Sequence, residues 1–314
     1  MTNLRIVVIS ILVAMGGVFG YFVFAQEDRI ELSITPLSFE LTANPGDPPI
    51  ENTIRVFNPT NNTIAVEMEA EDFEALGEGG EIIVAPQEEI TYSLKRWVRI
   101  IPEKFTLEPK EHQFVRFVIE VPENAEPGGK WCSILAGIGG IIGEQFTGTA
   151  VTIKTGALVL LTVSGDFVED LVVREFTAPS FLEQGPVPFT IKFENRGTVH
   201  VRPKGFVTIR KPGFLFFEET KVADVIFPQQ NVLPGAVRKV EAELNKKWLF
   251  GKYTANLVGS YGDANLPFNI FLTFWVFPWK IALGVFIIIL LMIIFFVKTR
   301  RRWRLAFRAL FKGE

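Results

Sequence analysis

The C-terminal apolar run most constrains what this chain can fold into. Residues 281–297 form a stretch of 17 residues without a charged side chain, and the basic sequence Lys298-Thr-Arg-Arg-Arg302 follows it directly. A helix of that length spans roughly 26 Å, slightly less than a bilayer hydrocarbon core of about 30 Å. Tryptophans bracket the run, as they do at membrane–water interfaces. The sequence therefore predicts one transmembrane helix over 279–297, with these anchor residues: Trp279, Ile281, Val297 and Trp303.

The basic tail, residues 298–314, predicts the orientation of that helix. Positive residues that flank a transmembrane helix favour the cytoplasmic side. We therefore expect a cytoplasmic tail and an extracytoplasmic ectodomain at the cell membrane. The tail is also weakly amphipathic, so lying on the inner leaflet is an alternative to a pure topology signal. The topology signal comprises Lys298, Arg300, Arg301, Arg302 and Arg304.

The N-terminal segment is a second apolar run. It extends from Ile6 to Ala25 and is followed by the polar pair Gln26-Glu27. A small residue before a polar sequence is typical of a signal-peptide cleavage site. We interpret residues 1–25 as a signal peptide, and an uncleaved anchor helix is the alternative.

The ectodomain is acidic and poor in catalytic side chains. Residues 27–278 carry 23 basic and 34 acidic residues, which argues against nucleic-acid binding. The single cysteine, Cys132, excludes an internal disulfide and a cysteine-based zinc cluster, and we expect it to be buried. The two histidines, His112 and His200, have no neighbouring triad pattern. The acidic residues between Glu67 and Glu81 lack the spacing of a calcium loop. We therefore expect no catalytic residue, metal or cofactor, and no enzyme.

Alternating apolar and polar residues recur throughout the ectodomain. Examples lie at 64–71, 114–121, 189–194 and 253–258, and Pro, Gly and Asn turns separate them. Short strands at such spacing are typical of immunoglobulin-like (Ig-like) sandwiches. The predicted fold class is an all-β ectodomain of two Ig-like β-sandwich domains, followed by a single transmembrane α-helix. The predicted domains are residues 27–163 and 164–278.

A glycine-rich stretch near residues 136–143 predicts a hairpin tip in the first domain. It lies between buried strands expected at Trp131–Ile138 and Thr149–Leu161, and it lacks the pattern of a phosphate-binding loop. Its apolar residues are unusual for a loop and make it a candidate partner-contact site. Open sheet edges are the other binding device that we expect of such sandwiches. The candidate contact loop contains Ile138, Ile141, Ile142 and Phe146.

Two stretches resemble a known family. The first runs from Leu32-Ser-Ile-Thr-Pro36 through Pro45-Gly46-Asp47 to Ile54-Arg-Val-Phe-Asn-Pro59. The second runs from Phe105-Thr-Leu-Glu-Pro109 through 115–122 to Pro127-Gly128-Gly129. Together they resemble the bacterial WxL-interacting cell-surface proteins, and more distantly the first domain of pilus chaperones. In the second domain the resemblance rests on Phe193-Glu-Asn-Arg-Gly197 and Gly251-Lys-Tyr-Thr-Ala255.

The WxL-interacting resemblance implies an order of parts and a set of partners. It implies a signal peptide, a peptidoglycan-binding Ig-like domain, a host-binding Ig-like domain, a membrane helix and a basic tail. The expected function is that of a non-enzymatic, membrane-anchored surface or adhesion protein in the bacterial envelope. Its expected partners are membrane lipid, cell-wall polymer and another surface protein, with no nucleic acid. A membrane-tethered chaperone or assembly factor acting by β-strand addition is the main alternative. An enzyme and a subunit of an envelope complex are two others.

Overall fold

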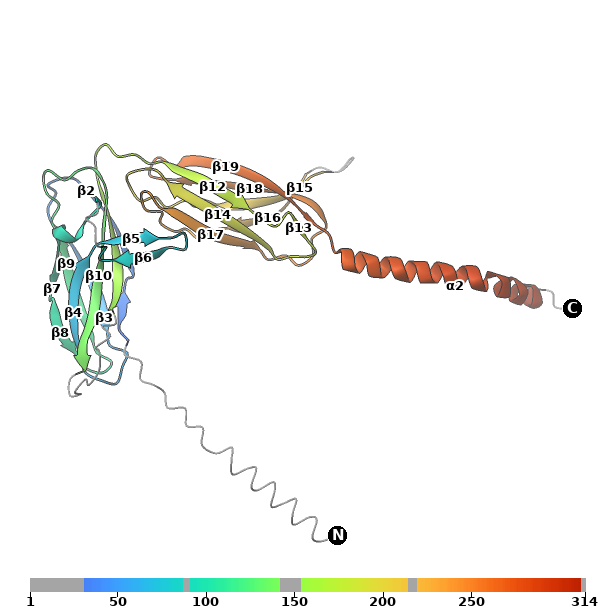
Figure 1. The fold of residues 1–314 in the computed structure, drawn as a ribbon, viewed down its shortest axis with the longest axis horizontal. Coiled ribbons are helices and arrows are strands. Elements are labelled where there is room, and N and C mark those ends of the chain that lie inside the picture. The colour runs from blue at the N-terminus through green and yellow to red at the C-terminus, as the bar shows by residue number, and fades with distance from the viewer. Residues whose placement is uncertain (1–30, 87–90, 142–153, 214–218, 312–314) are drawn as a thin grey trace, which may run out of the picture.

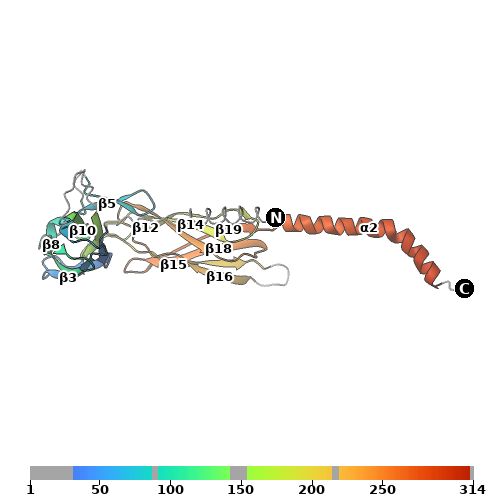
Figure 2. The same ribbon diagram turned by 90° about the horizontal axis from the view of Figure 1, so that it is seen from below.

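The computed structural model describes residues 31–86, 91–141, 154–213 and 219–311, with the side chains of 140–141 and 300–311 left out (Figures 1 and 2). The described chain forms two β-sandwiches followed by one long helix. The predicted fold class is therefore confirmed. The predicted signal peptide lies outside the described residues.

The first sandwich consists of a four-stranded and a five-stranded sheet. The four-stranded sheet has the order β1 (Ser33–Thr35), β3 (Ile50–Phe57), β9 (His112–Ile119), β7 (Val98–Ile101). The five-stranded sheet has the order β2 (Ser38–Ala43), β11 (Lys154–Val163), β10 (Gly128–Ile141), β4 (Ile64–Glu71), β8 (Lys104–Leu107). A hairpin of β5 (Phe73–Leu76) and β6 (Glu81–Val84) and the 3-10 turn η1 (Lys95–Trp97) complete it.

Alternating side chains build the core between these two sheets. Ile54 and Val56 of β3 and Phe117 of β9 are fully buried, and they pack with inward residues of β4, β10 and β11. Phe39 of β2 meets Phe117 edge to face, with 4.9 Å between ring centroids. A period of two is what one buried face of a strand requires. The alternation seen in the sequence is thus the pattern of this core.

The second sandwich pairs a three-stranded sheet with a five-stranded sheet. The three-stranded sheet has the order β12 (Leu171–Thr177), β14 (Val187–Asn195), β17 (Val237–Leu244). The five-stranded sheet has the order β13 (Phe181–Leu182), β19 (Leu266–Val276), β18 (Gly251–Tyr261), β15 (Lys204–Lys211), β16 (Thr220–Ile226). Its core is rich in phenylalanine, with four fully buried rings: Phe189, Phe193, Phe227 and Phe274.

The two sandwiches meet where the first ends and the second begins. The domain boundary predicted at 163/164 lies directly after β11, in the segment that leads to β12. Leu233 of the second sandwich joins Phe73, Trp131 and Leu160 of the first in one buried apolar cluster. Glu40 on β2 accepts hydrogen bonds from Arg202 and Asn231 across the same junction. The two sandwiches form a bent arrangement, with the first set across the long axis of the second (Figure 1).

A single helix, α2 (Trp279–Phe311), follows β19 after two residues. Its segment Trp279–Thr299 has a mean hydropathy of 3.0 and is not buried against the rest of the described chain. At 1.5 Å per residue, these 21 residues span roughly 31 Å, enough to cross a hydrocarbon core. The helix is therefore long and apolar enough to span a membrane. The backbone of the predicted tail continues the same helix as far as Phe311.

Candidate functional site

The hairpin singled out by its glycines lies at the end of the first sandwich that faces away from the second (Figure 1). Strand β10 continues as far as Ile141, so Gly137, Gly139 and Gly140 belong to a strand, whereas Gly143 lies outside the described residues. Ile138 is only 9% exposed and packs in the core, because it continues the inward series of Ile134 and Ala136. It is therefore not an exposed contact residue, contrary to the prediction. Ile142 and Phe146 lie outside the described residues.

Strand β11, which returns from this hairpin, has a partly open backbone edge. Strand β10 pairs with β11 from Lys154 to Val163, whereas β2 pairs with it only from Leu158 to Val163. No described residue pairs with Lys154–Ala157 on the side of β2. The N–H of Leu158 donates to the carbonyl of Leu37 at 3.0 Å. The backbone N–H of Leu158 therefore points toward the β2 side of β11.

Strand geometry identifies the free groups on this edge. Successive residues of a strand direct their N–H and C=O groups to opposite sides, so Gly156 and Lys154 point the same way as Leu158. Two donors and two acceptors are thus available for a further strand. Unpaired backbone groups of this kind are a template for pairing with an extended segment of another chain.

The edge is open because the N-terminal segment of the first sandwich pairs with β11 only from Ser38 onward. Residues Ser33–Thr35 pair with β3 in the opposite sheet, and the chain then crosses the sandwich at Pro36 and Leu37. Proline has no N–H to donate to a ladder, which keeps the crossing residue out of the sheet. Leu37 is 67% exposed at the edge where pairing begins. It places an apolar side chain next to the free backbone groups.

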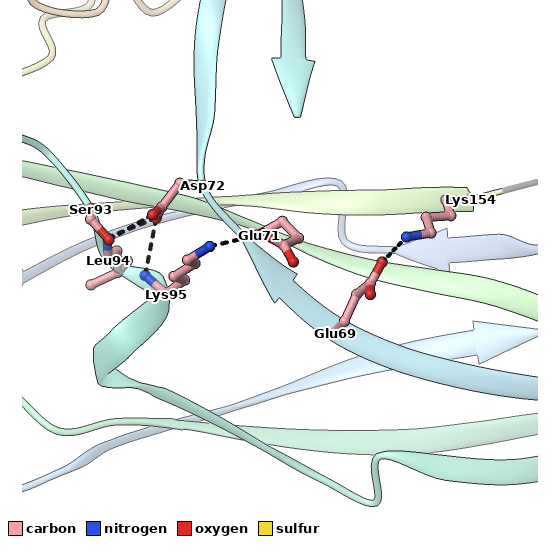
Figure 3. Close-up of polar contacts among 7 residues, drawn as sticks. All are labelled: Glu69, Glu71, Asp72, Ser93, Leu94, Lys95 and Lys154. Atoms are coloured by element: carbon pink, nitrogen blue, oxygen red, sulfur yellow. Dashed lines mark hydrogen bonds and ion pairs between the residues drawn. The ribbon is translucent and has the colours of Figure 1, made fainter. Parts of the chain in front are cut away.

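Charged side chains line the outer face of the five-stranded sheet along β4, which is separated from β11 by β10, and Lys154 of β11 reaches them (Figure 3). Glu67, Glu69 and Glu71 alternate along β4, and each is paired with a lysine: Glu67 with Lys104 at 2.7 Å, Glu69 with Lys154, and Glu71 with Lys95 at 3.1 Å. The hydrogen bond to Glu71 raises the pKa of Lys95, and that to Glu67 raises the pKa of Lys104. This acidic series is therefore a neutralised, solvent-facing ladder and not an open cation site.

Asp72, the next residue, is buried and makes hydrogen bonds to the segment at Ser93–Lys95. Its carboxylate is buried and accepts hydrogen bonds from the Ser93 hydroxyl at 2.7 Å and from the N–H groups of Leu94 and Lys95, each at 3.2 Å (Figure 3). A buried charge requires such partners. Asp72 thus fixes the segment that carries Lys95 against β4.

Gly156 fits closely under the neighbouring strand. A Cβ at this position would lie 2.7 Å from Leu135 Cδ2 and 3.0 Å from the carbonyl of Ile134. A side chain at this position would require the neighbouring side chain of Leu135 and the backbone at Ile134 to shift. Glycine leaves this part of the edge without a side chain of its own.

The remaining residues singled out from the sequence lie elsewhere. Cys132 is fully buried in the core, and burial raises the pKa of its thiol, so the prediction of a structural thiol agrees with its position. His112 is exposed at the start of β9. His200 lies at the junction of the sandwiches, and burial lowers its pKa. Within the described residues, no group of three or more metal-ligating side chains occurs.

Several other sheet edges are short, charged or already contacted. Strand β1 has three residues, and β7, β8 and β16 carry charged side chains such as Arg99, Lys104 and Lys221. Strand β17 is already contacted by the first sandwich, because the N–H of Lys239 donates to the carbonyl of Glu78 at 2.7 Å. Short length and charge are the usual means of blocking edge pairing. The free part of β11 differs from these edges in that it lies within a longer strand and next to the exposed Leu37.

Comparisons with known proteins give no family. No family model matches the chain, and no curated protein matches it. Membership of the WxL-interacting family therefore stays a prediction.

Solved structures with detectable similarity include pilus chaperones, the more distant of the two resemblances. The class 5 fimbriae chaperone CfaA is 13% identical with a TM-score of 0.39, over 77% of this chain and 98% of its own. The YadV chaperone is 9% identical with a TM-score of 0.37, over 77% and 100%. The E. coli chaperone DraB is 11% identical with a TM-score of 0.35, over 79% and 98%. At such scores and identities, the likeness carries no argument about function.

Proposed function

We propose that this chain is a non-enzymatic, membrane-anchored protein that binds an extended segment of a partner protein by β-strand addition in the first sandwich. The partner strand pairs with the free groups of Lys154 and Gly156 and continues alongside the hairpin of β10 and β11. Helix α2 holds the module at the membrane, with the ectodomain on the extracytoplasmic side and the basic tail in the cytoplasm.

The open edge of β11 is the observation that carries this proposal. It combines unpaired backbone groups with an exposed apolar neighbour, Leu37, and with the apolar sequence of the hairpin. Main-chain hydrogen bonds then supply affinity, and the neighbouring side chains supply specificity. Lys154, the charged side chain of the free segment, is itself paired with Glu69. Binding of cell-wall polymer stays a prediction of the sequence, because no described feature favours it.

The experiment is a comparison of two substitutions at one edge residue. Lys154→Pro removes the outward N–H, whereas Lys154→Ala keeps it and removes only the side chain that pairs with Glu69. Photo-cross-linking from position 37 in whole cells of the source organism measures partner capture by each full-length variant. A photo-cross-linker at the exposed Phe114 on the opposite sheet is the control.

Leaving a partner group unpaired costs about 1–3 kcal/mol, so we expect at least about a fivefold loss of adducts in Lys154→Pro. Lys154→Ala should keep them, and position 114 should give none. Thermal unfolding checks that both variants are folded. Equal adduct yields from the folded proline and alanine variants would refute strand addition at this edge.

A further inference from the structure

The end of the second sandwich that faces α2 carries a cluster of exposed aromatic side chains. Phe181, Trp248, Phe250, Trp275 and Trp279 are between 48% and 68% exposed. Phe277 lies among them, with its ring centroid 5.1 Å from that of Phe250. We call these six residues the aromatic base. Large aromatic side chains so exposed on one end of a domain mark a surface that contacts another phase or molecule.

Three separate segments supply the aromatic base. Phe181 of β13 is paired with Trp275 of β19, and the connection from β17 to β18 adds Trp248 and Phe250. The N–H of Phe277 donates to the carbonyl of Leu182 at 2.9 Å, which fixes the last residues before the helix to β13. The cluster is therefore a built surface of the folded sandwich.

The aromatic base is held at the start of the membrane-spanning segment. Only Phe277 and Pro278 separate β19 from α2, so the sandwich ends within roughly 11 Å of Trp279. The headgroup layer on each side of a bilayer is about 5–8 Å thick. With α2 in the membrane, the base has no room to lie far from the headgroups.

Charge at this end also suits a membrane surface. Lys246, Lys247 and Lys252 are exposed beside the aromatic base, whereas the ectodomain as a whole has an excess of acidic residues. Lys280 forms an ion pair of 2.7 Å with Glu183, which neutralises one of the acidic residues at this end. Lysines near anionic headgroups are attracted, and the acidic remainder is repelled. Both effects favour the same orientation, with this end toward the membrane.

We infer that the aromatic base is a lipid-binding surface that lies in the headgroup layer of the membrane that α2 crosses. Tryptophan, which has an apolar ring and a polar N–H, favours this layer, and three of the six residues are tryptophans: Trp248, Trp275 and Trp279. The second sandwich is thus docked on the bilayer and held at a defined orientation, not suspended from a loose tether. This inference rests on the membrane insertion in the proposed function, and it is independent of strand addition.

The test uses the full-length chain in vesicles of phosphatidylcholine and phosphatidylglycerol. A fluorophore is attached to Asn245→Cys, which is exposed next to the aromatic base, to Val168→Cys at the other end of the same sandwich, or to Ile288→Cys in α2. The native Cys132 is fully buried and does not compete under folding conditions. Lipids with a nitroxide at the headgroup or deep in the acyl chain quench the fluorophore by contact.

We expect the headgroup nitroxide to quench position 245 and not position 168, and the acyl-chain nitroxide to quench position 288. Trp248→Ser combined with Phe250→Ser should reduce quenching at position 245 to the level of position 168. Phe271→Ser, which removes an aromatic ring 74% exposed in the middle of β19, should leave it unchanged.

Quenching at position 288 without quenching at position 245 would overturn the docked surface alone. Quenching at position 245 that survives the double serine substitution would do so as well, because the tether would then suffice. Absence of quenching at position 288 would refute membrane insertion, and with it both proposals about the membrane.

Discussion

Each of the two sandwiches contains one buried asparagine that makes the same set of local hydrogen bonds. In the first, Asn58 follows β3, and in the second, Asn195 ends β14, and both are fully buried. Each side-chain oxygen accepts the N–H of the residue two positions later, Thr60 in one sandwich and Gly197 in the other. Each amide nitrogen donates to the carbonyl four positions later, that of Asn62 or Val199, at 2.8 Å. One local arrangement thus fixes a turn in each domain.

The difference lies in what each turn faces. The turn at Asn58 precedes β4 and closes the end of the first sandwich away from the second. The turn at Asn195 presents the carbonyl of Thr198 to the N–H of Gly129 in the first sandwich, at 2.8 Å. The first asparagine therefore stabilises its own domain, whereas the second also supports the junction. Two predictions test this distinction, and a third concerns a histidine close to the second turn.

Asn58→Ala should have the largest effect. It would remove the hydrogen bonds that the side chain donates to three carbonyl oxygens, those of Asn62, Leu107 and Glu108, and the two that it accepts, from the N–H and the hydroxyl of Thr60. Buried groups left without partners are costly, so we expect a loss of about 3 kcal/mol in the free energy of unfolding. Denaturant unfolding of the full-length chain in detergent measures it. A loss no larger than that of a surface substitution would show that the turn forms without the asparagine.

Asn195→Ala should cost less in stability but act on the junction as well. Its side chain makes one hydrogen bond fewer to carbonyl groups, so we expect a loss of about 2 kcal/mol. Hydrogen exchange at the amide of Gly129 should accelerate in this variant and stay unchanged in Asn58→Ala. Equal exchange in the two variants would remove the distinction between the turns.

His200, close to the second asparagine, should give the smallest effect. Burial lowers its pKa, and the buried Nδ1 atom has no hydrogen-bond partner within the described residues. As the pH falls below about 6.5, the ordinary value for histidine, the unfolded chain takes up the proton first. Stability should therefore be complete above that pH and decrease below it.

His200→Gln should flatten this dependence between pH 7.5 and about 5.5, a window in which exposed carboxylates of ordinary pKa stay ionised. Denaturant unfolding of the full-length chain at several pH values measures it. An unchanged slope in the variant would place the pH dependence elsewhere.

Much of the fold could be predicted because it depends on local pattern. Alternation in segments such as 64–71 and 189–194 indicated half-buried strands, and the proline and glycine turns separated them. The motifs Val56-Phe-Asn-Pro59 and Phe193-Glu-Asn-Arg-Gly197 were noticed for their resemblance to a family. Their physical role, a buried asparagine that fixes a turn, required the contacts of residues 107 and 232.

The candidate sites were harder to predict because they depend on pairings between distant segments. The open edge of β11 exists because β2 begins only at Ser38, and no pattern in β11 itself reveals this. The aromatic base gathers Phe181, Trp248 and Trp275, which lie far apart in the sequence. The glycines after Ile138 indicated a hairpin tip, yet β10 passes through them with a bulge and pairs with Ile64.

The position of β11 also has a mechanical consequence. Its C-terminal half, Leu158–Val163, lies between β10 and β2. The chain continues from there into the second sandwich and then into α2. In the proposed function, a partner strand paired with the edge at Lys154–Ala157 would load β11 along the strand axis, at right angles to the ladder hydrogen bonds. Those hydrogen bonds would then be sheared together and not broken one after another. The proposed function therefore implies that the first sandwich resists traction between a partner and the membrane.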